Sequence, residues 1–299
     1  MKGDKTIINS IIRGDTRGRV PDSVDRAKSE GTLAGRITRG RTPGEKSFHT
    51  ISSIFLSIII PCFNEEQNIR LGALEKVEHF MNKKKYSWEV LLVDDGSNDD
   101  SKVLIKDFIK DNPRFSLVEN DHQGKAVTVI TGMRQAMGKY RLFTDLDQAT
   151  PIMELDHLLP FIQDGYDIVI GSRNTQRKGA PFFRRLMARG FMISRNLILD
   201  LGINDTQCGF KLFTDKAALE IFKRIKVYKK EGKKSGATVT AGFDVEALFI
   251  AKKLGFKIKE VWVEWHYQET RRVNPLSDSV KGLIDLIKIR MNSLKGLYN

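Results

Sequence analysis

The sequence has little cysteine and no long apolar run. Its two cysteines, Cys62 and Cys208, form neither a disulfide framework nor a metal-ligand pattern, which favours a reducing compartment. The longest apolar run, residues 54–60, is too short to cross a bilayer, and the N-terminus lacks the apolar core of a signal peptide. No zinc-ligand spacing, basic zipper region or aromatic-plus-basic RNA motif occurs. The sequence therefore predicts a cytoplasmic protein that does not bind nucleic acid.

Positive charge, in contrast, is abundant. The 299 residues carry 50 lysines and arginines against 37 acidic residues, a net charge of +13. Such a balance favours anionic partners, namely nucleotides or phospholipid headgroups. Residues 1–50 hold 11 of the basic and 6 of the acidic residues with little apolar periodicity, so we expect residues 1–54 to form a poorly ordered or loosely packed basic arm.

From residue 55 onward, short runs of Ile, Leu and Val alternate with stretches of helical periodicity. Strands are predicted at residues 55–61, 89–93, 115–119, 140–144, 167–170, 256–265 and in the segment that ends at 213. Helices are predicted at residues 64–81, 99–111, 124–138, 152–163, 181–199, 215–224 and 243–254, and a polar loop at 226–240. Near-continuous apolar strands separated by helices indicate an α/β fold, a doubly wound and mostly parallel sheet with helices on both faces.

The C-terminal residues 276–299 are predicted to form a separate amphipathic helix after a catalytic domain at 55–275. Apolar residues recur there with the spacing of one helical stripe, which predicts a buried face: Leu276, Val280, Leu283, Ile287, Met291 and Leu294.

Two carboxylates, Asp145 and Asp147, follow the predicted strand at residues 140–144. Alternate residues of a strand point to the same side, so this spacing can aim both at one point. Hard oxygen ligands of this kind suit Mg²⁺ or Mn²⁺, which completes its shell with phosphate oxygens and water. The alternative is a solvated loop after a strand.

Polar residues also follow two other predicted strands, at 64–65 and at 94–97. In parallel sheets, ligands bind at the carboxyl ends of strands, so the three clusters should converge on one nucleotide-type site. Asp94 is expected to have a structural role in this site and Asp95 a binding role.

Several of these segments together resemble the family 2 glycosyltransferases of the GT-A fold. They are Ser-Ile-Ile-Ile-Pro-Cys-Phe-Asn-Glu-Glu at 57–66, Val-Asp-Asp-Gly-Ser at 93–97, Asp-Leu-Asp at 145–147 and Gly-Ser-Arg at 171–173. Three more segments are similar to the dolichyl-phosphate β-glucosyltransferase, or polyprenyl-phosphate, branch: residues 205–214, 243–246 and 273–279. The resemblance covers roughly residues 57–286.

The resemblance implies a role for individual residues. It assigns to the nucleotide sugar Pro61, Phe63, Glu65, Val93, Asp95, Lys125, Asp145 and Leu146. It assigns to the metal Asp145 and Asp147, with Gln148 as a further amide ligand or a solvated neighbour. It assigns to catalysis Asp147, Arg173, Arg184 and Asp244, of which the two arginines would face phosphate groups.

The activity implied is inverting transfer of a hexose, with UDP-glucose as the favoured donor, onto a dolichyl or undecaprenyl phosphate. A phosphate monoester is largely a dianion at neutral pH, so it needs cations to hold it rather than a base. The arginines at 184, 185 and 189 would supply them, or else they form a solvated helix face. A soluble family 2 enzyme acting on a sugar hydroxyl, and a non-enzymatic sugar-nucleotide-binding module, are the alternatives.

A lipid acceptor implies work at the cytoplasmic face of a membrane. The predicted helices at 181–199 and 276–297 interleave apolar and basic residues, so both are candidates for a peripheral membrane surface. The alternatives are that the C-terminal stripe packs on the domain or in a dimer, or that a membrane-protein partner supplies the anchor.

Overall fold

A computed structural model describes residues 53–173, 182–228, 242–266 and 275–299, with the side chains of 182–189 and 275–279 excepted. The predicted arm at 1–54 therefore lies outside the described residues, apart from its last two. Most of the predicted loop at 226–240 also lies outside them. Among the described residues, no helix is long and apolar enough to cross a membrane.

A seven-stranded sheet forms the centre of the described part, in the order β3-β2-β1-β4-β6-β5-β7. The strands are β1 (Leu56–Cys62), β2 (Trp88–Asp94), β3 (Phe115–Glu119), β4 (Tyr140–Thr144), β5 (Ile168–Arg173), β6 (Phe210–Thr214) and β7 (Ile258–Val263). All neighbouring strands pair in parallel except where β6 lies antiparallel between β4 and β5. The predicted α/β class with a mostly parallel sheet is confirmed.

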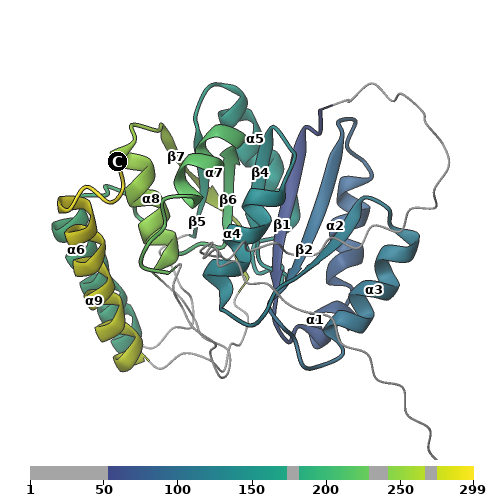
Figure 1. Cartoon of the computed structure of the whole chain (residues 1–299), viewed down its shortest axis with the longest axis horizontal. Coiled ribbons are helices and arrows are strands. Elements are labelled where there is room, and N and C mark those ends of the chain that lie inside the picture. Colours follow the sequence, from purple (N-terminus) through teal and green to yellow (C-terminus); the bar gives the residue numbers. More distant parts are fainter. Residues whose placement is uncertain (1–52, 174–181, 229–241, 267–274) are drawn as a thin grey trace, which may run out of the picture. The chain divides into compact units, whose positions relative to one another are not determined.

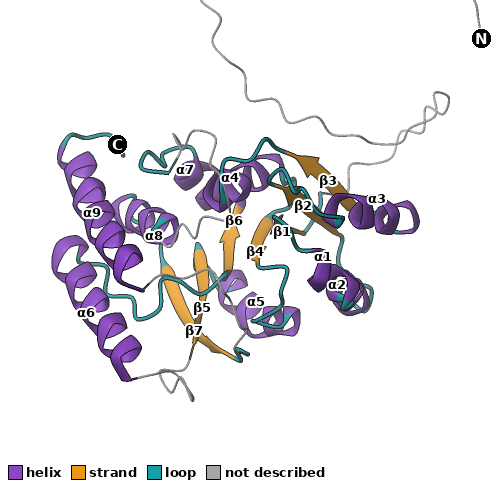
Figure 2. Ribbon diagram, turned by 90° about the horizontal axis from the view of Figure 1, so that it is seen from below, coloured by secondary structure: helices purple, strands orange, loops and turns teal. Residues whose placement is uncertain are grey.

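Helices cover both faces of the sheet (Figure 1, Figure 2). One face carries α1 (Glu66–Arg70), α2 (Ala73–Met81), α3 (Ser101–Asp111), the short 3₁₀ helix η1 (Ile152–Glu154) and α5 (Leu155–Gln163). The other carries α4 (Lys125–Gln135), α7 (Asp215–Phe222) and α8 (Phe243–Lys253). Strand β1 shows why both faces must be covered: Ile58 and Ile60 enter one apolar core, and Ile59 enters the other.

The helix predicted at 64–81 is wrong in one respect, because it is two helices. Gly72 has φ = +77° between α1 and α2, a left-handed conformation that glycine adopts without strain. The helix predicted at 124–138 also ends early, at Gln135. Beyond it, Gly138 passes so close to β1 that a Cβ there would lie 2.5 Å from the backbone nitrogen of Ser57.

The two remaining helices, α6 (Phe182–Leu199) and α9 (Pro275–Leu294), pack side by side (Figure 1, Figure 2). Gly282 of α9 allows the close approach, since a Cβ there would lie 2.8 Å from the ring of Phe191. Leu286 and Ile289 of α9 are buried in the core that α4, α7 and α8 share.

The buried stripe predicted for the C-terminal helix is wrong. Its described members are exposed by 37% to 69%: Val280, Leu283, Ile287, Met291 and Leu294. Leu276 lies among the side chains that the structure does not describe. The face that α9 buries is the neighbouring one, because the helix is rotated to place Leu286 and Ile289 in the core.

Candidate functional site

The carboxyl ends of β1, β2 and β4 lie at one edge of the sheet, because these strands run parallel and pair directly. The antiparallel strand β6 begins at the same edge, where Phe210 pairs with Thr144. The chain fills one side of β1 with β2 and β3 and then crosses to β4 on the other side. Ligands of doubly wound sheets bind at such a switch point.

Asp145 follows the last residue of β4 at this edge and contacts a lysine from the start of α4. The Nζ atom of Lys125 lies 2.6 Å from Asp145 Oδ1, and each side chain is about one third exposed, at 37% and 33% respectively. Gly209, in the turn before β6, leaves room for the carboxylate, since a Cβ there would lie 2.0 Å from Asp145 Oδ2. The sequence therefore needs glycine at 209 to keep Asp145 in place.

Asp147 lies two residues further along the same loop. Its Oδ1 accepts a hydrogen bond of 3.0 Å from the backbone N–H of Ala149. Burial raises the pKa of Asp147, and the charge of Asp145 raises it further, against the smaller opposing effects of the Ala149 N–H and Lys125. Burial is the larger cause of this rise, and a cation between the two carboxylates would remove only the smaller part, which comes from the charge of Asp145.

Gln148 shapes the loop between the two carboxylates and η1. Its φ of +51° is left-handed, its Nε2 donates to the carbonyl of Asp145, and its Oε1 accepts from the N–H of Ile152. The side chain is only 9% exposed, so the expectation of a solvated amide is wrong. The assignment of Gln148 to a metal stays a prediction.

A second lysine–aspartate pair lies beside the first. Lys211 of β6 places its Nζ 2.6 Å from Oδ1 of Asp244 in the first turn of α8, and also donates to the carbonyl of Cys208. The Nζ atoms of Lys125 and Lys211 lie 5.3 Å and 5.8 Å from the centroid of the Phe143 ring. The structure thus places Asp244 beside the two carboxylates of the loop.

Charge interactions in this group act on Lys125 as well. Burial disfavours its ammonium, but the carboxylates of Asp145, Asp244 and Asp147 outweigh that effect and raise its pKa. Burial raises the pKa of Asp244, and the two lysines oppose that rise. Sequence analysis did not single out Lys211. Its one signal was a lysine in the middle of an otherwise apolar strand, which is rarely tolerated without a buried partner.

The residues after β2 hold the neighbouring loops together. Asp95 is 2% exposed, and its two carboxylate oxygens accept 2.9 Å hydrogen bonds from the backbone N–H groups of Gln123 and Gly124. Nδ1 of His122 lies 2.8 Å from Asp95 Oδ2, and the His122 ring stacks on Phe63 with centroids 4.2 Å apart. In the structure Asp95 fixes the turn before α4, and a nucleotide-binding role for it stays a prediction.

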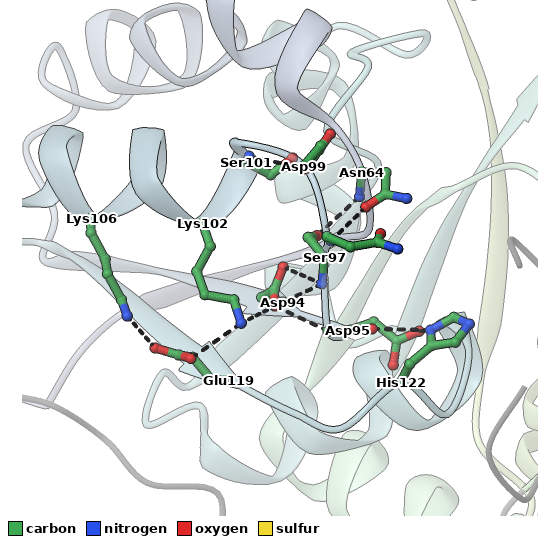
Figure 3. A network of polar contacts seen from close by, with 12 residues as sticks. Asn64, Asp94, Asp95, Ser97, Asp99, Ser101, Lys102, Lys106, Glu119 and His122 are labelled. Carbon is green, nitrogen blue, oxygen red and sulfur yellow. Dashed lines mark hydrogen bonds and ion pairs between the residues drawn. The ribbon is translucent and has the colours of Figure 1, made fainter. Parts of the chain in front are cut away.

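Asp94 has the structural role expected of it (Figure 3). It is fully buried and accepts hydrogen bonds from the N–H groups of Gly96 and Ser97, while Lys102 of α3 lies 3.5 Å away. Lys102 also pairs with Glu119 at the end of β3, which in turn pairs with Lys106. The same network reaches β1, because the Ser97 hydroxyl accepts from the N–H of Asn64.

Other residues assigned to the nucleotide sugar differ in what they can offer. Val93 and Leu146 are 0% and 2% exposed and belong to the two apolar cores, so any contact with a ligand falls to their backbone. Pro61 pairs with Val93 near the end of β1 and is partly exposed. Glu65 accepts a hydrogen bond from the side-chain amide of Asn68.

Arg173, at the end of β5, is engaged with a carboxylate. Its Nε and Nη2 donate to Asp205 at 2.7 Å and 2.9 Å, and its backbone N–H donates at 3.1 Å. Although burial disfavours the Asp205 carboxylate, these bonds lower its pKa to about 2. The pair holds the 203–207 segment against β5, and the phosphate-facing role of Arg173 stays a prediction.

One arginine of helix α6, Arg195, is buried. Arg195 is 3% exposed and donates to the Thr206 hydroxyl at 2.8 Å and to the carbonyl of Ile203, so it stabilises the same segment from the other side. The side chain of Arg184, like those at 185 and 189, lies outside the described part, and its assignment to the acceptor stays a prediction.

Two carboxylates beside a switch point are typical of a ligand-binding site in an α/β protein. Comparison with known proteins identifies the family. The model of "Glycosyl transferase family 2" matches residues 57–222. The chain therefore belongs to glycosyltransferase family 2 and is a transferase.

Curated relatives and solved structures agree with this assignment. The dolichyl-phosphate beta-glucosyltransferase of Dictyostelium discoideum is 32% identical, with 83% of this chain and 77% of that protein covered. The Saccharomyces cerevisiae protein of the same name is 31% identical, with 82% and 77% covered. A structure of glucosyl-3-phosphoglycerate synthase from Mycobacterium tuberculosis with UDP has a TM-score of 0.57 at 16% identity, covering 80% of this chain and 81% of that one. A second structure of that enzyme, with Mn²⁺, UDP and glucosyl-3-phosphoglycerate, has a TM-score of 0.53 at 15% identity, with the same shares covered. The fold is GT-A, as expected from the sequence.

Proposed function

We propose that this protein transfers glucose from UDP-glucose onto a polyprenyl phosphate, dolichyl or undecaprenyl, for glycan assembly, with inversion at the sugar carbon. The names of the relatives support the sugar and the class of acceptor. The observation in the structure that carries the proposal is the pair of carboxylates after β4, with Lys125 against Asp145.

In this proposal Asp145 and Asp147 hold Mg²⁺ or Mn²⁺ on the diphosphate of the donor. Their chemistry fits, because both offer hard oxygen atoms and the Asp145 carboxylate is already balanced by a cation in contact with it. The described residues contain no group of three or more His, Cys, Asp or Glu side chains that could hold a metal. A donor set of two carboxylates requires the diphosphate oxygens to complete the shell. When bound, the metal offsets the charge that builds on the leaving UDP.

The remaining residues of the site bind the donor. Phe63, stacked on His122, offers an aromatic surface for the base, and Asp95 and Glu65 border the ribose. Lys125 contacts Asp145 and would be available to the diphosphate if a metal neutralised that carboxylate. Asp244, fixed by Lys211, faces the transferred sugar.

The acceptor phosphate attacks the sugar carbon directly, because it is already an anionic nucleophile. Arg184 binds it through charge and bidentate hydrogen bonds. Arg173 faces the phosphate groups from the end of β5, and binding one of them requires its guanidinium to give up part of its contact with Asp205. A sugar-hydroxyl acceptor would need a free carboxylate as general base, and Asp244 is held by Lys211 at 2.6 Å. This pairing favours a phosphate acceptor over the soluble alternative.

In this proposal the acceptor is a lipid that stays in the membrane. The protein therefore works at the cytoplasmic face of the membrane, bound peripherally or through a membrane-protein partner. Residues 55–275 form the catalytic domain in this proposal, 276–299 the C-terminal amphipathic helix, and 1–54 a basic arm.

A transfer assay tests the proposal. UDP-glucose, UDP-GlcNAc and GDP-mannose are each offered with polyprenyl phosphate and, separately, with a water-soluble sugar, in Mg²⁺, Mn²⁺ or chelator. We expect transfer from UDP-glucose to the lipid that the chelator abolishes, and NMR of the product should show inversion. Transfer to the sugar hydroxyl, or transfer that survives the chelator, would contradict it.

A further inference from the structure

Positively charged side chains lie along one edge of the exposed apolar stripe of α9. Lys281 and Lys288 of α9 and Lys295, which directly follows its last residue, are all exposed and lie seven residues apart. The N–H of Lys295 still donates to the carbonyl of Met291, so at about 100° per residue the three lysines form one row. By the same rotation the row lies directly beside the apolar stripe and away from the buried side that carries Leu286 and Ile289. The helix therefore presents a buried side, an apolar side and a basic side.

Helix α6 lies beside α9 (Figure 1, Figure 2), and its Phe191 packs against Gly282. The exposed apolar residues of α6, Ile193 and Leu197, are 55% and 81% exposed, but at about 100° per residue they lie on the side of α6 away from Phe191. The apolar surface beside the lysine row therefore belongs to α9. We call it the α9 surface and define it by its exposed apolar residues: Val280, Leu283, Ile284, Ile287, Met291 and Leu294.

We propose that the α9 surface lies flat on an anionic lipid bilayer, with the apolar residues in the headgroup boundary and the lysine row on lipid phosphates. The inference deepens the proposed function by assigning the face that meets the membrane, and it rests on that function only for the lipid nature of the acceptor. A helix with an apolar face and a basic border binds membranes in this orientation.

Charge complementarity favours a lipid surface over a second copy of the chain. From Val280 to the C-terminus, Asp285 is the only acidic residue, and it already pairs with Lys288 and accepts from the Tyr228 hydroxyl. A second copy would therefore bring its own lysine row without acidic partners, whereas anionic headgroups neutralise such a row.

Sedimentation with vesicles that lack any polyprenyl phosphate tests the inference on the full chain. Vesicles of phosphatidylcholine and phosphatidylglycerol in equal parts are compared with vesicles of phosphatidylcholine alone. We expect binding to the mixed vesicles at low salt that weakens as salt is added. No binding to the mixed vesicles at low salt would overturn the inference.

Two sets of variants identify the surface. Ile287→Ser, Met291→Ser and Leu294→Ser combined should weaken vesicle binding at least about tenfold, because three apolar side chains no longer enter the boundary. Its matched control replaces three apolar residues that are exposed elsewhere, Leu71, Val103 and Met137, with serine and should bind normally.

Lys281→Gln, Lys288→Gln and Lys295→Gln combined should also weaken binding at least about tenfold, with Lys76→Gln, Lys83→Gln and Lys85→Gln as the matched control. Size-exclusion chromatography with light scattering accompanies each variant. A dimer that the serine variant converts to a monomer, with vesicle binding unchanged, would assign the surface to a second copy instead. Because the vesicles contain no acceptor, vesicle binding by a protein without transferase activity would refute the proposed function and leave this inference standing.

Discussion

Two lysine–aspartate pairs lie side by side in the site, with the same 2.6 Å contact and different surroundings. The side chains of Lys125 and Asp145 are 37% and 33% exposed, whereas those of Lys211 and Asp244 are 2% and 10% exposed. A pair that water reaches gains little net free energy, while breaking a buried pair leaves a charge that water cannot reach. The first pair can therefore exchange its partners when a ligand arrives, and the second is a fixed part of the fold.

The largest effect should come from breaking the buried pair. Lys211→Met should lower the free energy of unfolding by about 3–5 kcal/mol, because Asp244 loses its counter-charge in a buried position. Urea unfolding measures this, with the exposed Lys216→Met as control. Adding Asp244→Asn to Lys211→Met should recover much of the loss. A cost for Lys125→Met as large as that for Lys211→Met would remove the distinction between the pairs.

The next effect concerns transfer rather than folding. Asp145→Asn and Asp147→Asn should each slow transfer at least about a hundredfold, on the order of 3 kcal/mol of transition-state stabilisation, because the proposed metal loses a charged ligand. Circular dichroism and urea unfolding should stay near the wild type. Asp107→Asn, whose carboxylate is 77% exposed on α3, is the control. A near-normal rate in either variant would contradict the metal assignment.

A third ion pair, Arg173–Asp205, sharpens the comparison through pH. The folded pKa of Asp205 is about 2, against about 3.9 for an unfolded aspartate. A lowered carboxylate pKa adds stability above the unfolded value and loses it as the pH falls from about 4 to 2, with about 2.5 kcal/mol at stake in total. Between pH 5 and 3 the wild type should therefore lose roughly 1 kcal/mol that Asp205→Asn does not lose. Urea unfolding at the two pH values measures the difference. If the wild type and Asp205→Asn lose the same free energy of unfolding between pH 5 and pH 3, the pair adds no stability.

The first half of the fold was predictable because local patterns determine it. Strands β1 to β4 were predicted from apolar runs and from the helical spacing between them. Polar residues at the strand ends predicted that the loops after these strands lie together. The order of the motifs indicated the family. Boundaries that depend on one residue, such as the break at Gly72, were missed. A single glycine within a helical pattern is tolerated, so the pattern alone does not show that the helix ends there.

The remaining features depend on contacts between distant residues, which periodicity does not contain. The stripe of α9 has the spacing of a buried face, but the packing of Phe191 on Gly282 and of Leu286 in the core turns it outward. Glu246 of α8 is another example. Its buried carboxylate accepts from Tyr298 at 2.6 Å and from the N–H of Val227. Partners 52 residues apart in the chain become visible only in the structure.

The smallest effect tests the Lys125–Asp145 pair itself. In the protein without nucleotide, the Lys125 ammonium and a divalent cation compete for the Asp145 carboxylate, since both neutralise the same oxygen atoms. A pair that is partly open to water is worth about 1 kcal/mol, so Lys125→Met should raise the affinity for Mn²⁺ by about fivefold. Electron paramagnetic resonance counts free Mn²⁺ directly and needs no turnover. Lys102→Met, which removes a lysine paired with Asp94 and Glu119, should leave Mn²⁺ binding unchanged.

Transfer by Lys125→Met should nevertheless fall, because the diphosphate loses a cation. The same variant should therefore bind the metal more tightly and transfer more slowly. If Mn²⁺ affinity in Lys125→Met equals that of the wild type, Lys125 and the cation do not compete for the Asp145 carboxylate. A rise much larger than fivefold would show that this pair is as strong as the buried one.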